Sequence, residues 1–357
     1  MGKRHFPADG ISPPVQRETI MKAVGYHRSL PIEAPEALVD LDLPVPVPGP
    51  RDLLVRVEAV SVNPVDIKMR ARATPPEGQA RILGWDAAGI VEAVGAEVTL
   101  FKPGDAVFYA GALDRPGSNS ELHLVDERIV GRKPASLSAA EAAALPLTAI
   151  TAWELLYDRL GVPYGVKTQE GVLLIINGAG GVGSILTQLA RRLTGLTVIA
   201  SASRPETIDW VKSMGAHHVI DHRKPLDEEL KALGIPQVQY VASLSNTEDH
   251  LKAIAEALAP QGKLALIDDP QTLDIVPFKR KSVSVHWEFM FTRPLFATAD
   301  MAAQHRLLDE VSALVDAGVL RTTLRQVLGK IDAATLRQAH ALLESGKSIG
   351  KTVLAGF

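Results

Sequence analysis

Hydrophobic and polar positions alternate in the first third of the chain. From residue 55 to 59, apolar side chains at every second position are separated by Arg56 and Glu58, which is the period of a half-buried β-strand. Prolines and glycines interrupt this region at short intervals, as expected for turns between strands. The pattern predicts a β-rich region from Met21 to about Ala135, with further short strands at 89–94, 106–110 and 122–125.

A different pattern begins near Ser138. The tetrapeptide Ser138-Ala-Ala-Glu141 is a capping box in front of an apolar helical run, so a helix is expected to begin there. From Gly171 onward, short apolar runs alternate with helical segments, which predicts parallel strands joined by crossover helices. The expected strands are 172–176, 197–201, 218–220, 238–244, 263–267, 283–291 and 351–355, and the expected helices begin near residues 182, 206, 226, 247, 300 and 333.

A glycine-rich loop follows the first of these buried strands. Gly178, Gly180 and Gly183 stand in the pattern G-x-G-x-x-G, between an apolar strand and a helical run. In this setting the first glycine permits a tight turn, the second lets a pyrophosphate approach, and the third lets helix and strand pack closely. The start of the helix, including Gly181 and Val182, would bind the phosphates. The loop predicts a dinucleotide site in a doubly wound parallel sheet; the alternative is a tight turn that binds nothing.

The end of the second strand bears on the choice of dinucleotide. An NAD-selective site usually carries Asp or Glu there for the ribose hydroxyls. Here the strand 197–201 runs into Ser203 and Arg204, and the first acid is Glu206. Since Ser203 and Arg204 can donate hydrogen bonds and charge to a 2′-phosphate, the sequence favours NADP(H). The alternative for Arg204 is a solvated loop charge.

Composition removes several classes of protein. With 38 basic and 41 acidic side chains, the net charge of −3 does not suggest nucleic acid as a partner. The chain has no cysteine, which excludes disulfides and chemistry that requires a thiolate. The charge-free window 171–190 is long enough to cross a bilayer, but the strand, loop and helix explain it, and no signal-peptide core is found near Met1. We expect a cytoplasmic protein that acts on a small molecule and does not contact membranes.

Short motifs along the chain resemble the medium-chain dehydrogenase/reductase superfamily. They run from Val62-Asn-Pro-Val-Asp66 through Gly84-Trp-Asp-Ala-Ala-Gly89, Lys102-Pro-Gly-Asp-Ala-Val107 and Pro146-Leu-Thr148 to the glycine loop. Together they resemble its zinc-free quinone-oxidoreductase-like branch. The segment Trp287-Glu-Phe-Met-Phe-Thr-Arg293 and the closing residues 346–351 are similar to a subgroup called zinc-type alcohol-dehydrogenase-like.

The resemblance implies an α/β protein with two domains. A GroES-like β-barrel catalytic domain would comprise residues 21–147 and 292–357, and a Rossmann domain would comprise residues 148–291. Residues 1–20 show no periodicity and are expected to be a flexible extension. The resemblance also implies an active site between the domains and a homodimer or homotetramer.

Zinc-dependent members of this superfamily differ at the metal-binding positions. They carry Cys where this chain has Asn63, and a His-Glu pair where it has Trp85 and Asp86. Tryptophan does not ligate metals, so we expect no catalytic zinc. Some quinone reductases also have Tyr where this chain has Lys68, which puts any role of that Tyr in doubt here.

Without a Lewis acid, reducing an electron-poor acceptor demands less of the protein than oxidising an alcohol. NADPH could pass hydride to a quinone or to the β-carbon of an α,β-unsaturated carbonyl, while the protein aligns the nicotinamide and stabilises the developing oxyanion. The matched motifs make Asn63 the candidate hydrogen-bonding group for the substrate oxygen or the nicotinamide. Tyr109 is a candidate proton donor, or else a tyrosine packed at the edge of the barrel.

The remaining candidate residues come from the same matched positions. Thr148 and Thr151 are expected to contact the nicotinamide, or simply to cap or pack their helix. Phe289 and Phe291 are expected in the cofactor site, and Lys351 either reaches a cofactor phosphate or is solvated. An apolar wall for a planar substrate ring would include Trp85, Trp287 and Met290.

The interpretation as an NADPH-dependent quinone or enone reductase has two competitors. A related enoyl-thioester reductase would strongly prefer acyl-CoA over free quinones. A non-catalytic NADPH-binding protein would bind the cofactor without turnover. The motifs identify the hydride donor, whereas the acceptor depends on the side chains that shape the substrate pocket.

Overall fold

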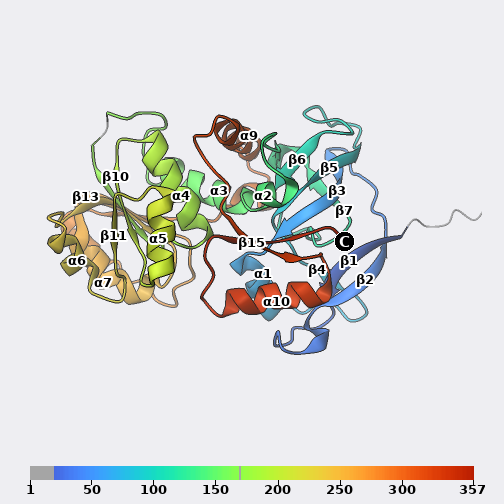
Figure 1. The fold of residues 1–357 in the computed structure, drawn as a ribbon, viewed down its shortest axis with the longest axis horizontal. Helices are drawn as coiled ribbons and strands as arrows, with labels where there is room; N and C mark the ends of the chain where they lie inside the picture. The colour runs from blue at the N-terminus through green and yellow to red at the C-terminus, as the bar shows by residue number, and fades with distance from the viewer. Residues whose placement is uncertain (1–19, 169) are drawn as a thin grey trace, which may run out of the picture.

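The computed structural model describes residues 20–168 and 170–357 (Figure 1). They form two lobes, one built on a helix-flanked parallel sheet and one rich in β-structure, and the chain ends in the β-rich lobe. Residues 1–19 of the predicted extension lie outside the described residues, and Ile20 already begins strand β1 (Ile20–Tyr26).

The parallel sheet has the strand order β11-β10-β9-β12-β13-β14, and every neighbouring pair is parallel. The order reverses between β9 and β12, the place where doubly wound sheets bind their ligands. This sheet confirms the predicted Rossmann fold. Its elements are β9 (Val172–Ile176), α4 (Gly181–Leu193), β10 (Thr197–Ser201), α5 (Pro205–Met214), β11 (His218–Ile220), α6 (Leu226–Ala232), β12 (Val238–Ser243), α7 (Thr247–Ala257), β13 (Leu258–Leu266), η4 (Val276–Lys281) and β14 (Ser284–Trp287).

The apolar run predicted as one strand at 283–291 divides into two structures. β14 stops at Trp287, and the chain then turns into the short helix α8 (Thr292–Leu295). Met290 and Phe291 are buried, so the apolar character of this segment reflects packing against other elements rather than pairing in the sheet. Periodicity alone does not separate these two causes.

The β-rich lobe contains two sheets. In the smaller one, β1 lies between β2 (Val39–Pro44) and β4 (Arg81–Ile82). The larger sheet has the order β15-β16-β3-β5-β6-β8, and β7 also pairs with β3. These sheets form the predicted GroES-like domain. The strands of the larger sheet are β3 (Asp52–Ser61), β5 (Ala87–Val94), β6 (Ala106–Tyr109), β7 (Leu122–Asp126), β8 (Val130–Arg132), β15 (Leu324–Gly329) and β16 (Lys351–Ala355).

The predicted capping box starts a helix as expected. Ser138 caps α2 (Ala139–Ala143), and its hydroxyl accepts from the amide of Glu141 at 3.3 Å. The helix α3 (Pro146–Trp153) follows and continues into η3 (Glu154–Arg159), a π-helical turn. The domain boundary expected between residues 147 and 148 therefore falls inside α3.

The last part of the chain returns to the β-rich lobe. Helix α9 (Ala303–Asp316) packs on β8, and α10 (Ala333–Glu344) packs on α1 (Pro64–Arg72). β16 then pairs antiparallel with β3. This return brings residues near the C-terminus beside residues near position 60.

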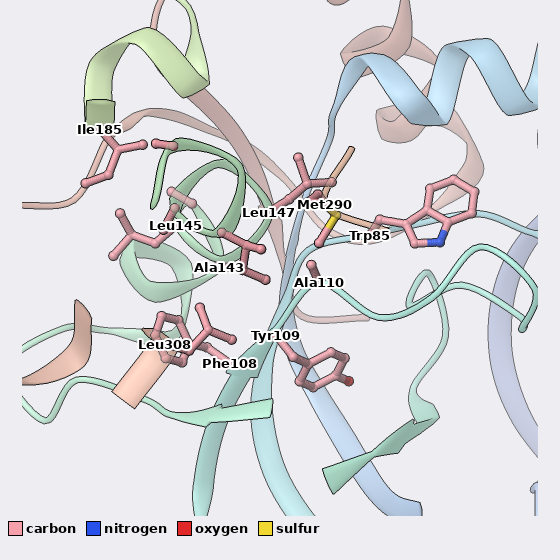
Figure 2. Packing of buried hydrophobic residues seen from close by; sticks show 14 of the residues in the cluster. Trp85, Phe108, Tyr109, Ala110, Ala143, Leu145, Leu147, Ile185, Met290 and Leu308 are labelled. Atoms are coloured by element: carbon pink, nitrogen blue, oxygen red, sulfur yellow. The ribbon is translucent and has the colours of Figure 1, made fainter. Parts of the chain in front are cut away.

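One apolar core runs through both lobes by way of α2, α3 and α4. Figure 2 shows part of it, where Leu145 and Ile185 lie on one side and Trp85 and Met290 on the other. Among the residues that the structure describes, no helix has the length and apolar character needed to span a bilayer.

Candidate active site

The glycine loop is held in place by backbone contacts with the neighbouring strand. After β9, Asn177 adopts a positive φ of 66°. Its amide donates to Ser201 Oγ at 2.9 Å, and the amide of Gly178 donates to Ser201 O at 3.0 Å. A Cβ on Gly183 would lie 2.5 Å from Asn177 O, so only glycine lets α4 start this close to the strand.

The start of α4 is open to a ligand. Its N-cap is Gly180, and no side chain caps the helix. Gly180, Gly181 and Val182 are half-buried, and a Cβ on Gly180 would meet nothing closer than the Asn177 side chain at 3.5 Å. The first amides of a helix lack internal partners and carry the positive end of its dipole. The loop therefore fits the pyrophosphate of a dinucleotide.

The residues after β10 are partly accessible. Ser203 is half-buried, and the side chain of Arg204 is one-third exposed. The Arg204 guanidinium donates to Lys347 O at 3.0 Å and forms an ion pair with Glu206 at 3.1 Å. Arg204 is thus tied to the loop before β16, and a phosphate would have to share it with Glu206.

The chain before β16 docks directly onto the glycine loop. The amide of Gly350 donates to Ala179 O at 2.9 Å, and a Cβ on Gly181 would lie 3.0 Å from Lys351 Cδ. The Lys351 ammonium continues inward to Val62 O and Asp86 Oδ2, both at 2.9 Å, and to Asn63 Oδ1. These three contacts use all three N–H donors of the ammonium. Lys351 is therefore engaged inside the protein, which differs from both the contact with a cofactor phosphate and the solvated lysine suggested by the sequence.

Asn63 is also fully engaged. It is 1% exposed, and its Nδ2 donates to Asp86 Oδ2 at 2.8 Å and to Ser61 O at 3.2 Å. Its Oδ1 accepts from Lys351. In this arrangement no amide hydrogen of Asn63 is left for a substrate, so the expected contact requires an exchange of partners.

Two buried carboxyl groups complete this network. Asp86 Oδ1 accepts from the amide of Leu147, at the start of α3, at 2.7 Å, and Asp66 Oδ2 accepts from the amide of Asn63 at 2.8 Å. Burial raises the pKa of both, that of Asp66 to about 7. The Lys351 network, comprising Asn63, Asp86 and Lys351, thus joins β16, α1, β5 and α3. Sequence patterns gave no sign of it, because its members are far apart in the chain.

Of the two threonines of α3, Thr148 lies beside the glycine loop. A Cβ on Gly181 would be 2.9 Å from Thr148 Cγ2. The hydroxyl of Thr148 donates to Leu145 O at 3.1 Å, and that of Thr151 donates to Leu147 O at 2.8 Å. These are bonds within the helix, which leave the hydroxyl oxygens able to accept a hydrogen bond from a ligand.

The aromatic candidates separate into two groups. Trp85, Met290 and Phe291 are buried, and the Trp85 and Phe291 rings lie edge to face with their centroids 6.4 Å apart. Figure 2 shows Trp85 and Met290 on the same side of the core. Phe289 contacts Phe291 at 5.6 Å but is 48% exposed, and Trp287 is 53% exposed on the edge strand β14. Trp287 is therefore not part of the buried wall.

Tyr109 lies inside the β-rich lobe. It is fully buried, its hydroxyl lies 3.0 Å from His123 Nδ1, and the two rings stack at 5.5 Å. Burial raises the pKa of Tyr109 and lowers that of His123 to about 4. Figure 2 shows the Tyr109 ring apart from Trp85 and Met290. This position matches the packed tyrosine that the sequence left as the alternative to a proton donor.

Metal-binding geometry is not found around these groups. Within 20–168 and 170–357, no three His, Asp or Glu side chains are arranged so that they could hold a metal ion. Asn63, which the resemblance aligns with a zinc ligand of metal-dependent members, is bonded to an ammonium and a carboxylate.

Comparisons with known proteins agree with this architecture. Residues 49–141 match the alcohol dehydrogenase GroES-like domain, and residues 214–354 match the zinc-binding dehydrogenase family. The zinc-type alcohol dehydrogenase-like protein SAS2087 of Staphylococcus aureus (strain MSSA476) is 41% identical over 336 residues, covering 94% of this chain and 99% of the relative.

Solved structures are similar over almost the whole chain. A protein from Rhizobium etli CFN 42, solved under the description of a zinc-dependent alcohol dehydrogenase, is 59% identical with a TM-score of 0.91, covering 95% of this chain and 99% of that one. The quinone oxidoreductase from Coxiella burnetii is 27% identical with a TM-score of 0.76, covering 95% and 100%. The chain therefore belongs to the medium-chain dehydrogenase/reductase superfamily of oxidoreductases.

Proposed function

We propose that the protein is an NADPH-dependent reductase that transfers hydride to a quinone or to an α,β-unsaturated carbonyl. The observation that carries this proposal is the open start of α4 at the glycine loop, with Thr148 of α3 beside it. The buried Trp85–Phe291 contact supplies the apolar wall. A dinucleotide held by its pyrophosphate at α4 would extend its nicotinamide towards α3 and this apolar wall.

The preference for NADPH rests on the end of β10. No carboxylate follows this strand until Glu206, and Ser203 and Arg204 come first. A carboxylate at the strand end would repel a 2′-phosphate, whereas a guanidinium attracts it. Glu206 pairs with Arg204 at 3.1 Å, so we expect phosphate binding to displace this exposed acid.

The bound cofactor supplies the hydride, and the protein supplies position and polarity. The buried wall of Trp85, Met290 and Phe291 would exclude water from a planar acceptor placed against it. Because Tyr109 is bonded to His123 and Asn63 is bonded to Lys351 and Asp86, we infer that the proton for the reduced product comes from solvent. The similarity of this chain to the solved quinone oxidoreductase from Coxiella burnetii supports a quinone acceptor.

The test is steady-state oxidation of NADPH with phenanthrenequinone and with a simple enone, repeated with NADH and with a metal chelator. Turnover that prefers NADPH and is unaffected by the chelator is the expected result. A strong preference for an acyl-CoA acceptor would instead identify an enoyl-thioester reductase. Binding of NADPH without turnover across these acceptors would identify a binding protein.

A further inference from the structure

The segment 287–293 contributes Glu288 and Arg293 to a buried ionic cluster. The proposed function does not use these two residues. Glu288, directly after β14, and Glu154, at the start of the π-helical turn, are 2% and 1% exposed. Arg159 Nε donates to Glu288 Oε2 at 2.8 Å, and Arg293 Nη1 lies 2.5 Å from Glu154 Oε1. Arg159 Nη2 also lies 4.0 Å from Glu154 Oε2, so Arg159 faces both acids and Arg293 faces Glu154.

The two carboxyl groups face the same guanidinium, that of Arg159. Glu154 Oε2 and Glu288 Oε1 are buried, and neither has a hydrogen-bond partner among the residues that the structure describes. Carboxylates are acceptors only, so a proton held between the two groups would supply the missing donor. Burial and the neighbouring charge of Glu154 raise the pKa of Glu288 to about 9, and the pair therefore holds its proton at neutral pH.

The charged groups around the pair include more acids than arginines. Arg293 divides its guanidinium among Glu154, Asp158 at 3.0 Å and Asp300 at 2.9 Å. On the side of β14, burial lowers the pKa of His286, which keeps that ring neutral. From α9, the neutral Gln304 contacts Glu154. Glu154, Glu288, Asp158 and Asp300 thus share two arginines, and loss of the shared proton would leave this buried cluster with an excess of negative charge.

The pair connects two segments that the proposed function assigns to the nicotinamide and the substrate. Glu154 continues α3, the helix that carries Thr148 and Thr151. Gln304 Nε2 donates to both Glu154 Oε1, at 3.2 Å, and Met290 O, at 2.6 Å. Glu288 lies two residues before Met290, so the pair and Gln304 fix the backbone of the apolar wall against α3.

We propose that Glu154 and Glu288 share one proton and act as positioning residues, holding Met290 and Phe291 at the right distance from α3 for hydride transfer. This inference rests on the proposed reductase function. The proton stays within the pair and is not passed to the substrate. Turnover therefore depends on the protonation of a group that lies outside the reacting atoms.

The test compares Glu288→Gln with Glu288→Leu by steady-state kinetics with NADPH and phenanthrenequinone from pH 6 to 10. Glutamine keeps a donor towards Glu154, so we expect kcat near the wild-type value at pH 7. In the wild type, kcat should fall as pH rises through the range in which the pair loses its proton. This fall should be absent from Glu288→Gln. Leucine breaks the pair and should lower kcat about tenfold to a hundredfold, with less change in KM. Glu256→Gln, an exposed acid of α7, is the control that should change nothing.

Fluorescence titration of NADPH and unfolding by denaturant, both measured across pH, separate this inference from the proposed function. If NADPH binds without turnover, the reductase function fails, and the pair is then judged by stability alone. If the folded protein keeps the proton on the pair, the unfolding free energy of the wild type should fall relative to that of Glu288→Gln as pH rises from the ordinary carboxyl pKa of 4.5 towards 9. Stability curves that stay parallel, or a Glu288→Gln variant with the wild-type alkaline loss, would overturn the inference.

Discussion

The glycine loop and the Lys351 network touch each other but are built in opposite ways. The loop contains no charged residue, and its partners are the backbone and small side chains of the adjoining strand. The network is made of buried polar and ionic groups, and Asn63 and Lys351 are 288 positions apart in the chain. The glycine loop depends on the absence of side-chain atoms, and the Lys351 network depends on a balance of charge. We therefore expect substitutions in the two regions to fail for different reasons.

The largest expected effect comes from removing the cation of the network. Lys351→Met leaves Asp86, which is fully buried, with an uncompensated charge. Breaking a buried ion pair on one side typically costs about 3–5 kcal/mol of unfolding free energy. Burial already raises the pKa of Asp86 and Lys351 opposes this, so without the lysine Asp86 takes up a proton. The cost, measured by denaturant unfolding, should then grow from pH 5 to pH 8.

Two controls identify charge as the cause. The double variant Lys351→Met with Asp86→Asn should recover part of the lost stability, because no unpaired charge remains. Lys347→Met, at an exposed lysine in the loop before β16, should leave the unfolding free energy almost unchanged. Equal destabilisation in the single and double variants would mean that packing of the lysine chain, rather than its charge, holds this region together.

The glycine loop should respond to shape rather than to charge. A Cβ at Gly183 would lie 2.5 Å from Asn177 O and 2.6 Å from Gly178 O, and overpacking of this kind costs about 1–3 kcal/mol. At Gly180 a Cβ meets only the Asn177 side chain at 3.5 Å, and its φ of −70° suits alanine. Gly183→Ala should therefore lower both stability and NADPH affinity.

Gly180→Ala provides the matched comparison. Its stability should stay within about 0.5 kcal/mol of wild type, while NADPH affinity falls because the methyl group occupies the space that the pyrophosphate needs. Fluorescence titration of NADPH and denaturant unfolding, performed on the same samples, measure both quantities. Wild-type affinity in Gly180→Ala would show that the pyrophosphate does not bind at this loop.

The same contrast explains what could be read from the sequence. The strands at 172–176, 197–201 and 218–220 and the turn at the glycine loop follow from local periodicity and local glycine positions, and the structure confirms these strands. The partners of Asn63 and the pairing of Glu288 with Glu154 depend on contacts across the fold. The segment predicted as a strand at 283–291 shows the limit, because composition does not distinguish Met290 and Phe291, buried in a turn, from residues of a buried strand.

The smallest expected effect concerns an ion pair that joins the lobes at the surface. Lys68 on α1 lies 2.9 Å from Asp269, which follows β13, and Arg72 lies 3.5 Å from the same carboxylate. Lys68 is 40% exposed and Asp269 is 54% exposed, unlike the fully buried Asp86. Both contacts cross between the lobes and are open to solvent, whereas the Lys351 network lies within the β-rich lobe and is buried.

A double-mutant cycle of Lys68→Ala and Asp269→Ala should give a coupling of only about 0.2–1 kcal/mol in the unfolding free energy. In roughly 1 M salt this coupling should disappear, since exposed charges are screened over about 3 Å. The hydrogen bond from Lys68 lowers the pKa of Asp269, so the contribution is present at neutral pH and is lost as pH falls through that lowered value. A salt-resistant coupling as large as that of Lys351 with Asp86 would mean that solvent access does not distinguish the two contacts, and would remove the basis of the comparison.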